Sequence, residues 1–238
     1  MRPPISTHWA TLTTRQAWLL VSGSLLLEVP ARWIVRPDIP DMVPGNPWFR
    51  LPVRLAVEVG LIMGVLALAR VCGASSLSVG VPRRAWTRWE WAMFGLVAII
   101  ELAVVILAVG HRWPRLAAAG LLGKALPWAA SEFLFGFNQE LGFRGGMMSG
   151  LLRLTSPLSA ALLNTLVFLA GPLHGPGLIG LALRQPGAAV GLLLGVVATG
   201  LFFSWLRYRS DNVVLCGVLH GIVNGFMNGA AFARRAYL

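Results

Sequence analysis

The sequence predicts an all-α polytopic integral membrane protein, and composition and hydropathy are the observations that predict it. The chain of 238 residues is 56% hydrophobic, has a mean hydropathy of +0.70, and is only 12% charged. A soluble domain would be about a quarter charged. Several apolar stretches approach or exceed the roughly 18 residues that span a bilayer, and the short alternating segments of a transmembrane barrel do not occur. We therefore expect a bundle of seven or eight transmembrane helices.

Apolar runs separated by polar connections place these helices in order along the chain. Seven runs cover residues 16–35, 51–72, 90–110, 116–138, 157–173, 187–206 and 212–232. An eighth arises if 139–153 forms its own segment or 177–184 enters the membrane. The longest connections, Pro37–Pro47 and Gly73–Thr87, have the Pro, Gly and Ser content of loops. Without an internal repeat or a long linker, residues 1–238 are predicted to form a single membrane domain.

The basic charge of the chain is best explained by the membrane. The net charge is +11, and arginines gather between apolar runs, as at Arg83, Arg84 and Arg88 and again at Arg207 and Arg209. Arginines in such places anchor helix ends at anionic lipid headgroups. Nucleic-acid binding is not supported, and the arginine distribution leaves the membrane orientation open.

The two cysteines and the N-terminus suggest no processing or cross-linking. Cys72 and Cys216 lie in or beside apolar runs, where thiols are more often packing residues than a disulfide, and no metal-type Cys spacing occurs. The first fourteen residues are polar and no small-residue cleavage site follows, so no removable signal peptide is predicted.

Polar side chains inside apolar helices are the candidates for function. On insertion scales a charged group at the centre of a membrane helix costs about 2.5–3.5 kcal/mol, so such groups tend to face the bundle interior and to mark function. The candidates are Glu28, Glu58, Glu101, Glu132, Glu140, His174, His220 and Asn224.

Two of these candidates, Glu28 and Glu140, each have an arginine four residues further along the chain. Glu28 and Arg32 stand at i,i+4, which predicts a structural or interfacial ion pair. Glu140 and Arg144 have the same spacing, and we expect a structural pair that shapes the site. Three glycines within residues 142–146 would leave one side of that helix bare and allow close helix approach.

Two further polar elements follow in the C-terminal half. His220 and Asn224 are again i,i+4, and Asn228 continues the same face as a supporting partner or a helix-packing residue. His174 lies in a segment with two prolines and three glycines, which is expected to end a helix. Each His alone is also compatible with a hydrogen-bonded core residue or an interfacial residue at a helix end.

Together and in this order, the three elements resemble the CAAX-protease and bacteriocin-processing (CPBP) family of intramembrane glutamic endopeptidases. Residues 138–145 read N-Q-E-L-G-F-R-G, where the family commonly has N-E-E-L-G-F-R-G. His174 matches the histidine of the second motif, and His220 with Asn224 matches the third, His-x-x-x-Asn. The likeness covers roughly residues 120–230, including the helix that ends near Ser210.

Two positions depart from the family pattern. Ala170 stands where the second motif usually has a Phe four residues before its His, and the nearest aromatic residue is Phe168. Gln139 occupies the position of the family's catalytic glutamate.

The resemblance implies hydrolysis without a metal or other cofactor. A buried glutamate with a raised pKa would act with the second-motif His to deprotonate a water. The third-motif His and Asn would hydrogen-bond the developing oxyanion, a contribution of about 2.7–4 kcal/mol per donor in other acyl-transfer enzymes. Carried over, Gln139 holds the base position, His174 is the water partner, and His220 and Asn224 are the oxyanion donors.

Glutamine retains the shape of glutamate but has no basic oxygen near neutral pH. The expected function is therefore an intramembrane endopeptidase, with this chain a catalytically dead form. An engineered inactive variant is favoured over a natural pseudoenzyme, because the other polar elements are intact and costly to keep in lipid.

Three other classes stay open at this point. The first is a non-catalytic CPBP-like scaffold or bacteriocin-immunity protein that binds a peptide or lipid. The second is a zinc enzyme with His174, His220 and Glu140 as ligands. The third is a transporter, against which stand the missing inverted repeat and the crowding of polar groups in the C-terminal half.

The expected partners are membrane lipids and a peptide or C-terminal segment of a membrane-anchored substrate protein. The arginine-rich, lysine-poor composition points to a GC-rich bacterium and so to a bacterial inner membrane. Peptide maturation, or the surface-sorting role of the myxosortase-like branch of the family, is then favoured over prenyl processing.

Overall fold

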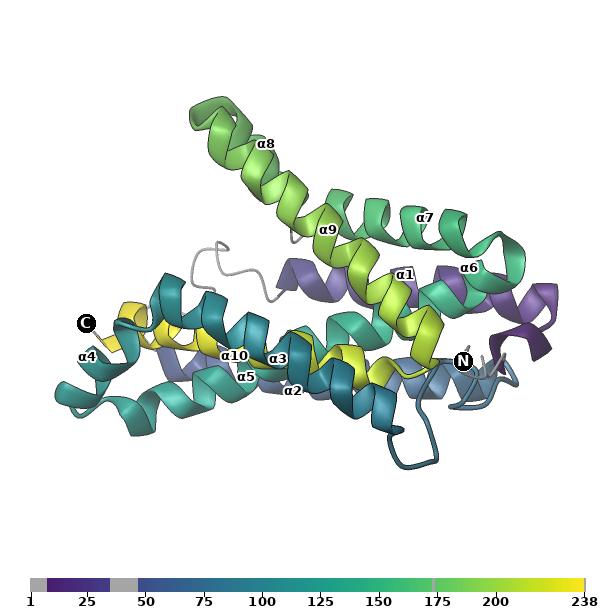
Figure 1. Cartoon of the computed structure of the whole chain (residues 1–238), viewed down its shortest axis with the longest axis horizontal. Coiled ribbons are helices and arrows are strands. Elements are labelled where there is room, and N and C mark those ends of the chain that lie inside the picture. The colour runs from purple at the N-terminus through teal and green to yellow at the C-terminus, as the bar shows by residue number, and fades with distance from the viewer. Residues whose placement is uncertain (1–7, 35–46, 173, 238) are drawn as a thin grey trace. The chain divides into compact units, whose positions relative to one another are not determined.

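The computed structural model describes residues 8–34, 47–172 and 174–237, and these residues form helices and connections without a strand (Figure 1). The all-α class is therefore confirmed. The elements are η1 (His8–Thr11), α1 (Thr14–Ile34), α2 (Pro47–Val71), α3 (Arg88–Val109), α4 (Arg112–Ala118), α5 (Leu122–Glu140), the π-helix η2 (Leu141–Met147), α6 (Met148–Leu154), α7 (Pro157–Ala170), α8 (Gly175–Arg184), α9 (Pro186–Ser210) and α10 (Val213–Tyr237).

Four helices among the described residues are long and apolar enough to cross a membrane. They are Leu51–Val71 in α2, Arg88–Val109, Pro186–Ser210, and Val213–Ala231 in α10. The helices α7 and α8 meet at an angle of 66° and make a fifth span if they count as one broken crossing. An integral membrane protein is thus confirmed, but the predicted count of seven or eight spans is not.

The described part of the chain divides into two compact units. The first unit falls within Met1–Ile39, Leu61–Arg83 and Leu141–Val213, and the second within Pro40–Gly60, Arg84–Glu140 and Val214–Leu238. The prediction of one membrane domain over residues 1–238 stays a prediction.

In the first unit, helices pack through small residues. The helix α1 packs on η2 and α6, α7 packs on α9, and Figure 1 shows α8 doubling back along α9. Gly150 lies against the backbone of Ala17, and Gly146 lies against Ser24, so α1 approaches the η2–α6 segment closely. Glu28 and Arg32 on α1 form the predicted ion pair at 2.9 Å, with both side chains 1% exposed.

In the second unit, α5 and α10 lie side by side (Figure 1). A glycine occurs at every fourth position of α10, and these four glycines contact Ala129, Phe133 or Phe137 of α5; they are Gly217, Gly221, Gly225 and Gly229. Because glycine has no side chain, the two helix backbones come close along their whole contact. An apolar cluster that includes Trp128, Ala125 and Ala230 packs beyond the end of this contact.

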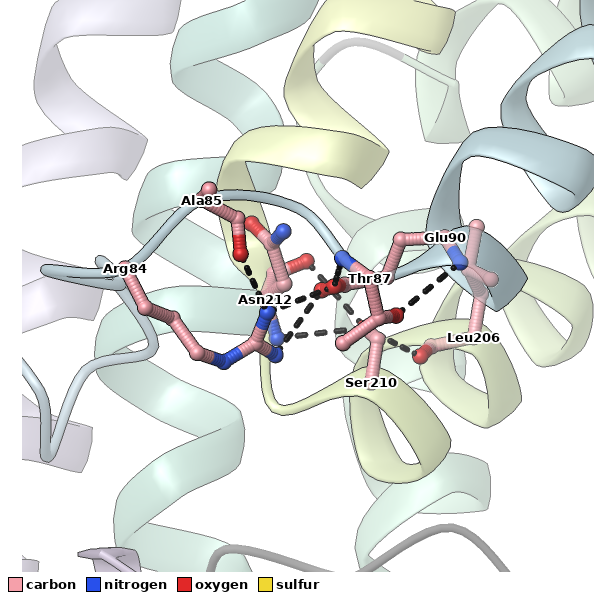
Figure 2. A network of polar contacts seen from close by, with 7 residues as sticks. All are labelled: Arg84, Ala85, Thr87, Glu90, Leu206, Ser210 and Asn212. Atoms are coloured by element: carbon pink, nitrogen blue, oxygen red, sulfur yellow. Dashed lines mark hydrogen bonds and ion pairs between the residues drawn. The ribbon is translucent and has the colours of Figure 1, made fainter.

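The polar ends of α3 and α9 are stabilised by local hydrogen bonds (Figure 2). Thr87 and Glu90 form a capping box at the start of α3, and Arg84 donates to both carboxylate oxygens of Glu90 at 2.6 and 3.1 Å. At the end of α9, the hydroxyl of Ser210 donates to the Leu206 carbonyl at 2.8 Å and accepts from the Asn212 amide at 3.1 Å.

Arg207 has a role other than the predicted headgroup anchoring. Arg207 is fully buried, pairs with Asp211 at i,i+4, and donates to the Ser149 hydroxyl at 3.1 Å. The prediction of an interfacial Arg207 was wrong because Asp211 and Ser149 supply the charge and the acceptor that allow a guanidinium to be buried.

Cys72 and Cys216 are buried and free, which confirms that they are packing residues. Burial raises the pKa of the Cys72 thiol, so little reactive thiolate is present near neutral pH.

Candidate active site

The polar residues of α10 meet α5 in an antiparallel series of three contacts, which we call the polar ladder. Residues 140, 136 and 132 of α5 face residues 220, 224 and 228 of α10, so each step is one helical turn on both helices. The prediction that His220, Asn224 and Asn228 share a face agrees with these contacts.

The first contact joins Glu140 to His220. The Nδ1 atom of His220 lies 2.7 Å from Oε1 of Glu140, whose side chain is fully buried, while the His220 side chain is 14% exposed. A hydrogen bond to one ring nitrogen decides how the imidazole is oriented and which tautomer it adopts. The sequence did not reveal this partner, because the two residues are separated by 80 positions.

The second contact places Asn224 against a glycine. A Cβ atom on Gly136 would lie 2.9 Å from Nδ2 of Asn224 and 2.7 Å from the carbonyl oxygen of His220. Only glycine fits such an approach, so Gly136 brings the His220–Asn224 turn directly onto the backbone of α5.

The third contact extends from α10 through α5 to α2. Nδ2 of Asn228 donates to Oε2 of Glu132 at 3.2 Å, and Arg54 of α2 pairs with the other oxygen, Oε1. Arg54 also lies 3.5 Å from the Ser131 hydroxyl. Arg54 and Glu132 are 7% and 2% exposed, so this is a buried ion pair. Sequence analysis listed Glu132 as a candidate without finding either partner.

Gln139 is buried beside the ladder. It is 2% exposed and stands between Asn138 and Glu140, both 0% exposed, in the last turn of α5. Asn138 in turn donates to the Glu58 carboxylate at 2.8 Å and to the Glu58 carbonyl at 3.4 Å. Gln139 therefore lies in the second unit together with His220 and Asn224.

The motif that begins at Gln139 continues into a π-helix, which sequence analysis did not predict. The residues Leu141–Met147 adopt i→i+5 geometry and are all buried. Such wide turns are frequent at functional sites. Glycines at 142, 145 and 146 are the sequence signal, since they lower the barrier to irregular helix geometry.

Arg144 lies on this π-helix in the first unit. Its guanidinium is 4.6 Å from the centre of the Phe168 ring, and its Nη2 atom is 3.5 Å from the Gly200 carbonyl. Glu140 and Arg144 belong to different units, and their predicted pairing stays a prediction.

His174 lies at the break between α7 and α8, as its glycines and prolines predicted. Its ring centroid is 4.7 Å from that of Phe168. His174 belongs to the first unit, so its predicted place beside Gln139 stays a prediction. Within the described residues, no group of three or more His, Cys, Asp or Glu side chains is arranged to hold a metal ion.

Helices long and apolar enough to span a membrane define an integral membrane protein, and its α5 and α10 bring a buried carboxylate and an imidazole together. Residues 121–226 match the family model described as Type II CAAX prenyl endopeptidase Rce1-like. The match includes Gln139, Arg144, His174 and the His220–Asn224 turn. Residues 121–226 are thus similar to the family of CAAX-type intramembrane proteases. No curated protein and no solved structure matches the chain.

Proposed function

We propose that the chain binds a peptide or the C-terminal segment of a membrane-anchored protein and that Gln139 prevents its hydrolysis. The observation that carries the proposal is the contact between Glu140 and His220 at 2.7 Å, one residue from Gln139. A glutamate at position 139, as the family commonly has, would stand next to Glu140, whose carboxylate already orients His220. An amide holds a water there but cannot take its proton.

The polar ladder supports the proposed roles of His220 and Asn224. Because Nδ1 of His220 faces Glu140, Nε2 is the ring nitrogen left to face a substrate carbonyl oxygen. Nε2 donates there when the pair holds two protons, one on Nε2 and one between Nδ1 and the Glu140 carboxylate; with a single proton on Nδ1, Nε2 is an acceptor. The Asn224 amide, one turn away, would supply the second hydrogen bond to the oxyanion.

The same contact favours a second candidate function. A carboxylate paired with a histidine is itself an acid–base unit, and Glu140 would then be the base in place of residue 139. In that case the chain as it stands is an active endopeptidase of a bacterial inner membrane.

A cleavage assay with purified protein in lipid vesicles separates the two candidates. The variants are the unsubstituted chain, Gln139→Glu, Glu140→Gln, and Gln139→Glu with His220→Ala. The probes are a farnesylated CAAX peptide and an unprenylated transmembrane peptide with a C-terminal tail, and mass spectrometry reads the products.

If the proposal holds, Gln139→Glu raises the cleavage rate by about 10²–10⁴ over the unsubstituted chain, and His220→Ala abolishes the gain. Activity of the unsubstituted chain that Glu140→Gln removes would establish Glu140 as the base instead. Binding of either peptide without cleavage by any variant would place the chain among the non-catalytic scaffold or immunity proteins.

A further inference from the structure

The helix α3 carries a single carboxyl group in the apolar part of its span. Beyond Glu90 in the first turn, Glu101 is the only charged side chain up to Val109, and the other residues are apolar or glycine. This helix is one of the candidate membrane spans. Glu101 is not part of the polar ladder. A charged group inside a membrane helix is costly, so its presence indicates a function and calls for a partner.

Glu101 stands on the inner face of α3. Val97 and Val105, one turn before and one turn after it, are both buried. Ile100 and Leu102, its direct neighbours, are exposed, as side chains that meet lipid would be. Glu101 itself is half-buried, and its Oε2 atom is fully buried. The carboxyl group is therefore directed into the second unit.

The inner face of α3 brings this carboxyl group near the first contact of the polar ladder. Glu101 and Glu140 are close enough for their charges to repel each other. Glu140 in turn lies 2.7 Å from Nδ1 of His220. A cation placed beside Glu101 would be attracted by Glu101 and by Glu140, whereas an anion would be repelled by both. The charge at this place therefore favours a cationic ligand.

The described residues supply no hydrogen-bond partner for the Oε2 atom of Glu101. Two arginines of the second unit are engaged elsewhere, Arg54 with Glu132 and Arg84 with Glu90. A buried carboxyl group without a partner destabilises the fold, whether it is ionised or protonated. A bound molecule that brings a donor to this atom would relieve that cost.

We propose that Glu101 binds a basic side chain of the peptide and so helps to select the substrate. This assignment rests on the proposed function, in which the peptide lies against His220. The apolar stem of an arginine or lysine packs among apolar side chains while its charged head reaches a carboxylate. The resulting charge-assisted hydrogen bond is stronger than one between neutral groups.

The unsubstituted chain is suited to the test, because under the proposed function it binds the peptide without cutting it. The chain is placed in nanodiscs of zwitterionic lipid, so that headgroup charge does not attract the peptide. The probes are fluorescent transmembrane peptides in which a single arginine is moved through the C-terminal tail and the adjoining end of the apolar segment. At each position a matched peptide carries citrulline, which has nearly the shape of arginine without its charge. Fluorescence anisotropy gives the Kd of each peptide.

At one or more positions, the arginine peptide binds about 10- to 100-fold more tightly than its citrulline match. Glu101→Gln removes this difference and leaves the Kd of the citrulline peptides unchanged. Because this substitution removes a carboxyl group whose Oε2 has no partner among the described residues, its thermal unfolding shows no loss of stability. The control on the same helix is Glu90→Gln, which removes a carboxylate already paired with Arg84 and keeps the preference for arginine.

Equal affinities for arginine and citrulline peptides at every position would overturn the inference, as would an arginine preference that persists in Glu101→Gln. Weaker binding of both peptides in Glu101→Gln would show that Glu101 accepts from a neutral group of the peptide, and a basic side chain would then be refuted. The chain failing to bind any of the peptides would refute the proposed function itself, and the inference with it.

Discussion

The two units hold their histidines in different ways. In the second unit, His220 is fixed by a hydrogen bond to a buried carboxylate, and the helices around it are joined by further polar contacts such as Asn228 to Glu132. In the first unit, His174 is contacted by an aromatic ring at a helix break. The hydrogen bond to Glu140 bears on the protons of the His220 imidazole, whereas the ring contact bears on the orientation of the His174 imidazole.

The glycines of the two units also differ in what they contact. On α10, four glycines spaced by four residues all contact α5. On α9, Gly187, Gly191 and Gly195 have the same spacing, yet a Cβ atom added at any of them would meet nothing within 4 Å. The same sequence pattern is thus a helix contact in one unit and an open stripe in the other.

The largest expected effect comes from breaking the buried ion pair of Arg54 and Glu132, which extends the third contact of the polar ladder. Arg54→Met leaves the Glu132 carboxylate buried without its cation, and the free energy of unfolding should fall by about 3–5 kcal/mol. The double substitution Arg54→Met with Glu132→Leu removes both charges and should recover most of this loss. Unfolding in mixed detergent micelles, followed by circular dichroism, measures both. A double variant as unstable as the single one would show that the pair is not the cause.

A smaller effect should separate a paired polar group from an unpaired one. Asn228→Leu removes a donor to the Glu132 carboxylate and should cost about 1.5–3 kcal/mol. Thr165→Val in α7 is the matched control. Thr165 is 4% exposed, and its hydroxyl finds no hydrogen-bond partner among the described residues. This substitution should be neutral or slightly stabilising under the same unfolding conditions. Equal losses for both variants would contradict the assignment of Asn228 to the ladder.

The smallest expected effects on stability compare the glycines of α10 with those of α9. Gly221→Ala places a Cβ atom 2.8 Å from the carbonyl oxygen of Phe133, so it should destabilise the protein by about 1–3 kcal/mol. Gly191→Ala adds the same methyl group where it meets nothing, and its better helix propensity should stabilise by up to about 1 kcal/mol. Thermal unfolding of the two variants in one detergent decides the point. A loss of stability in Gly191→Ala would mean that the α9 stripe is also a packing surface.

The sequence by itself determined the class of the protein, the order of its helices and the motif residues. Hydropathy adds up within each helix, so α3 and α9 are recognisable as spans without their neighbours. The i,i+4 spacing of Glu28 and Arg32 was sufficient to predict their ion pair, because both residues lie on one turn of one helix.

Only the tertiary structure decided the partners of residues that lie far apart in the chain. The contact of Glu140 with His220, the ion pair of Arg54 with Glu132, and the Phe168 ring against His174 depend on which helix faces meet. The π-helix after Glu140 likewise depends on packing that turns Gly142 and Gly146 toward α1. Local patterns contain no information on how two helices are rotated against each other, and that rotation selects the partner of each buried polar group.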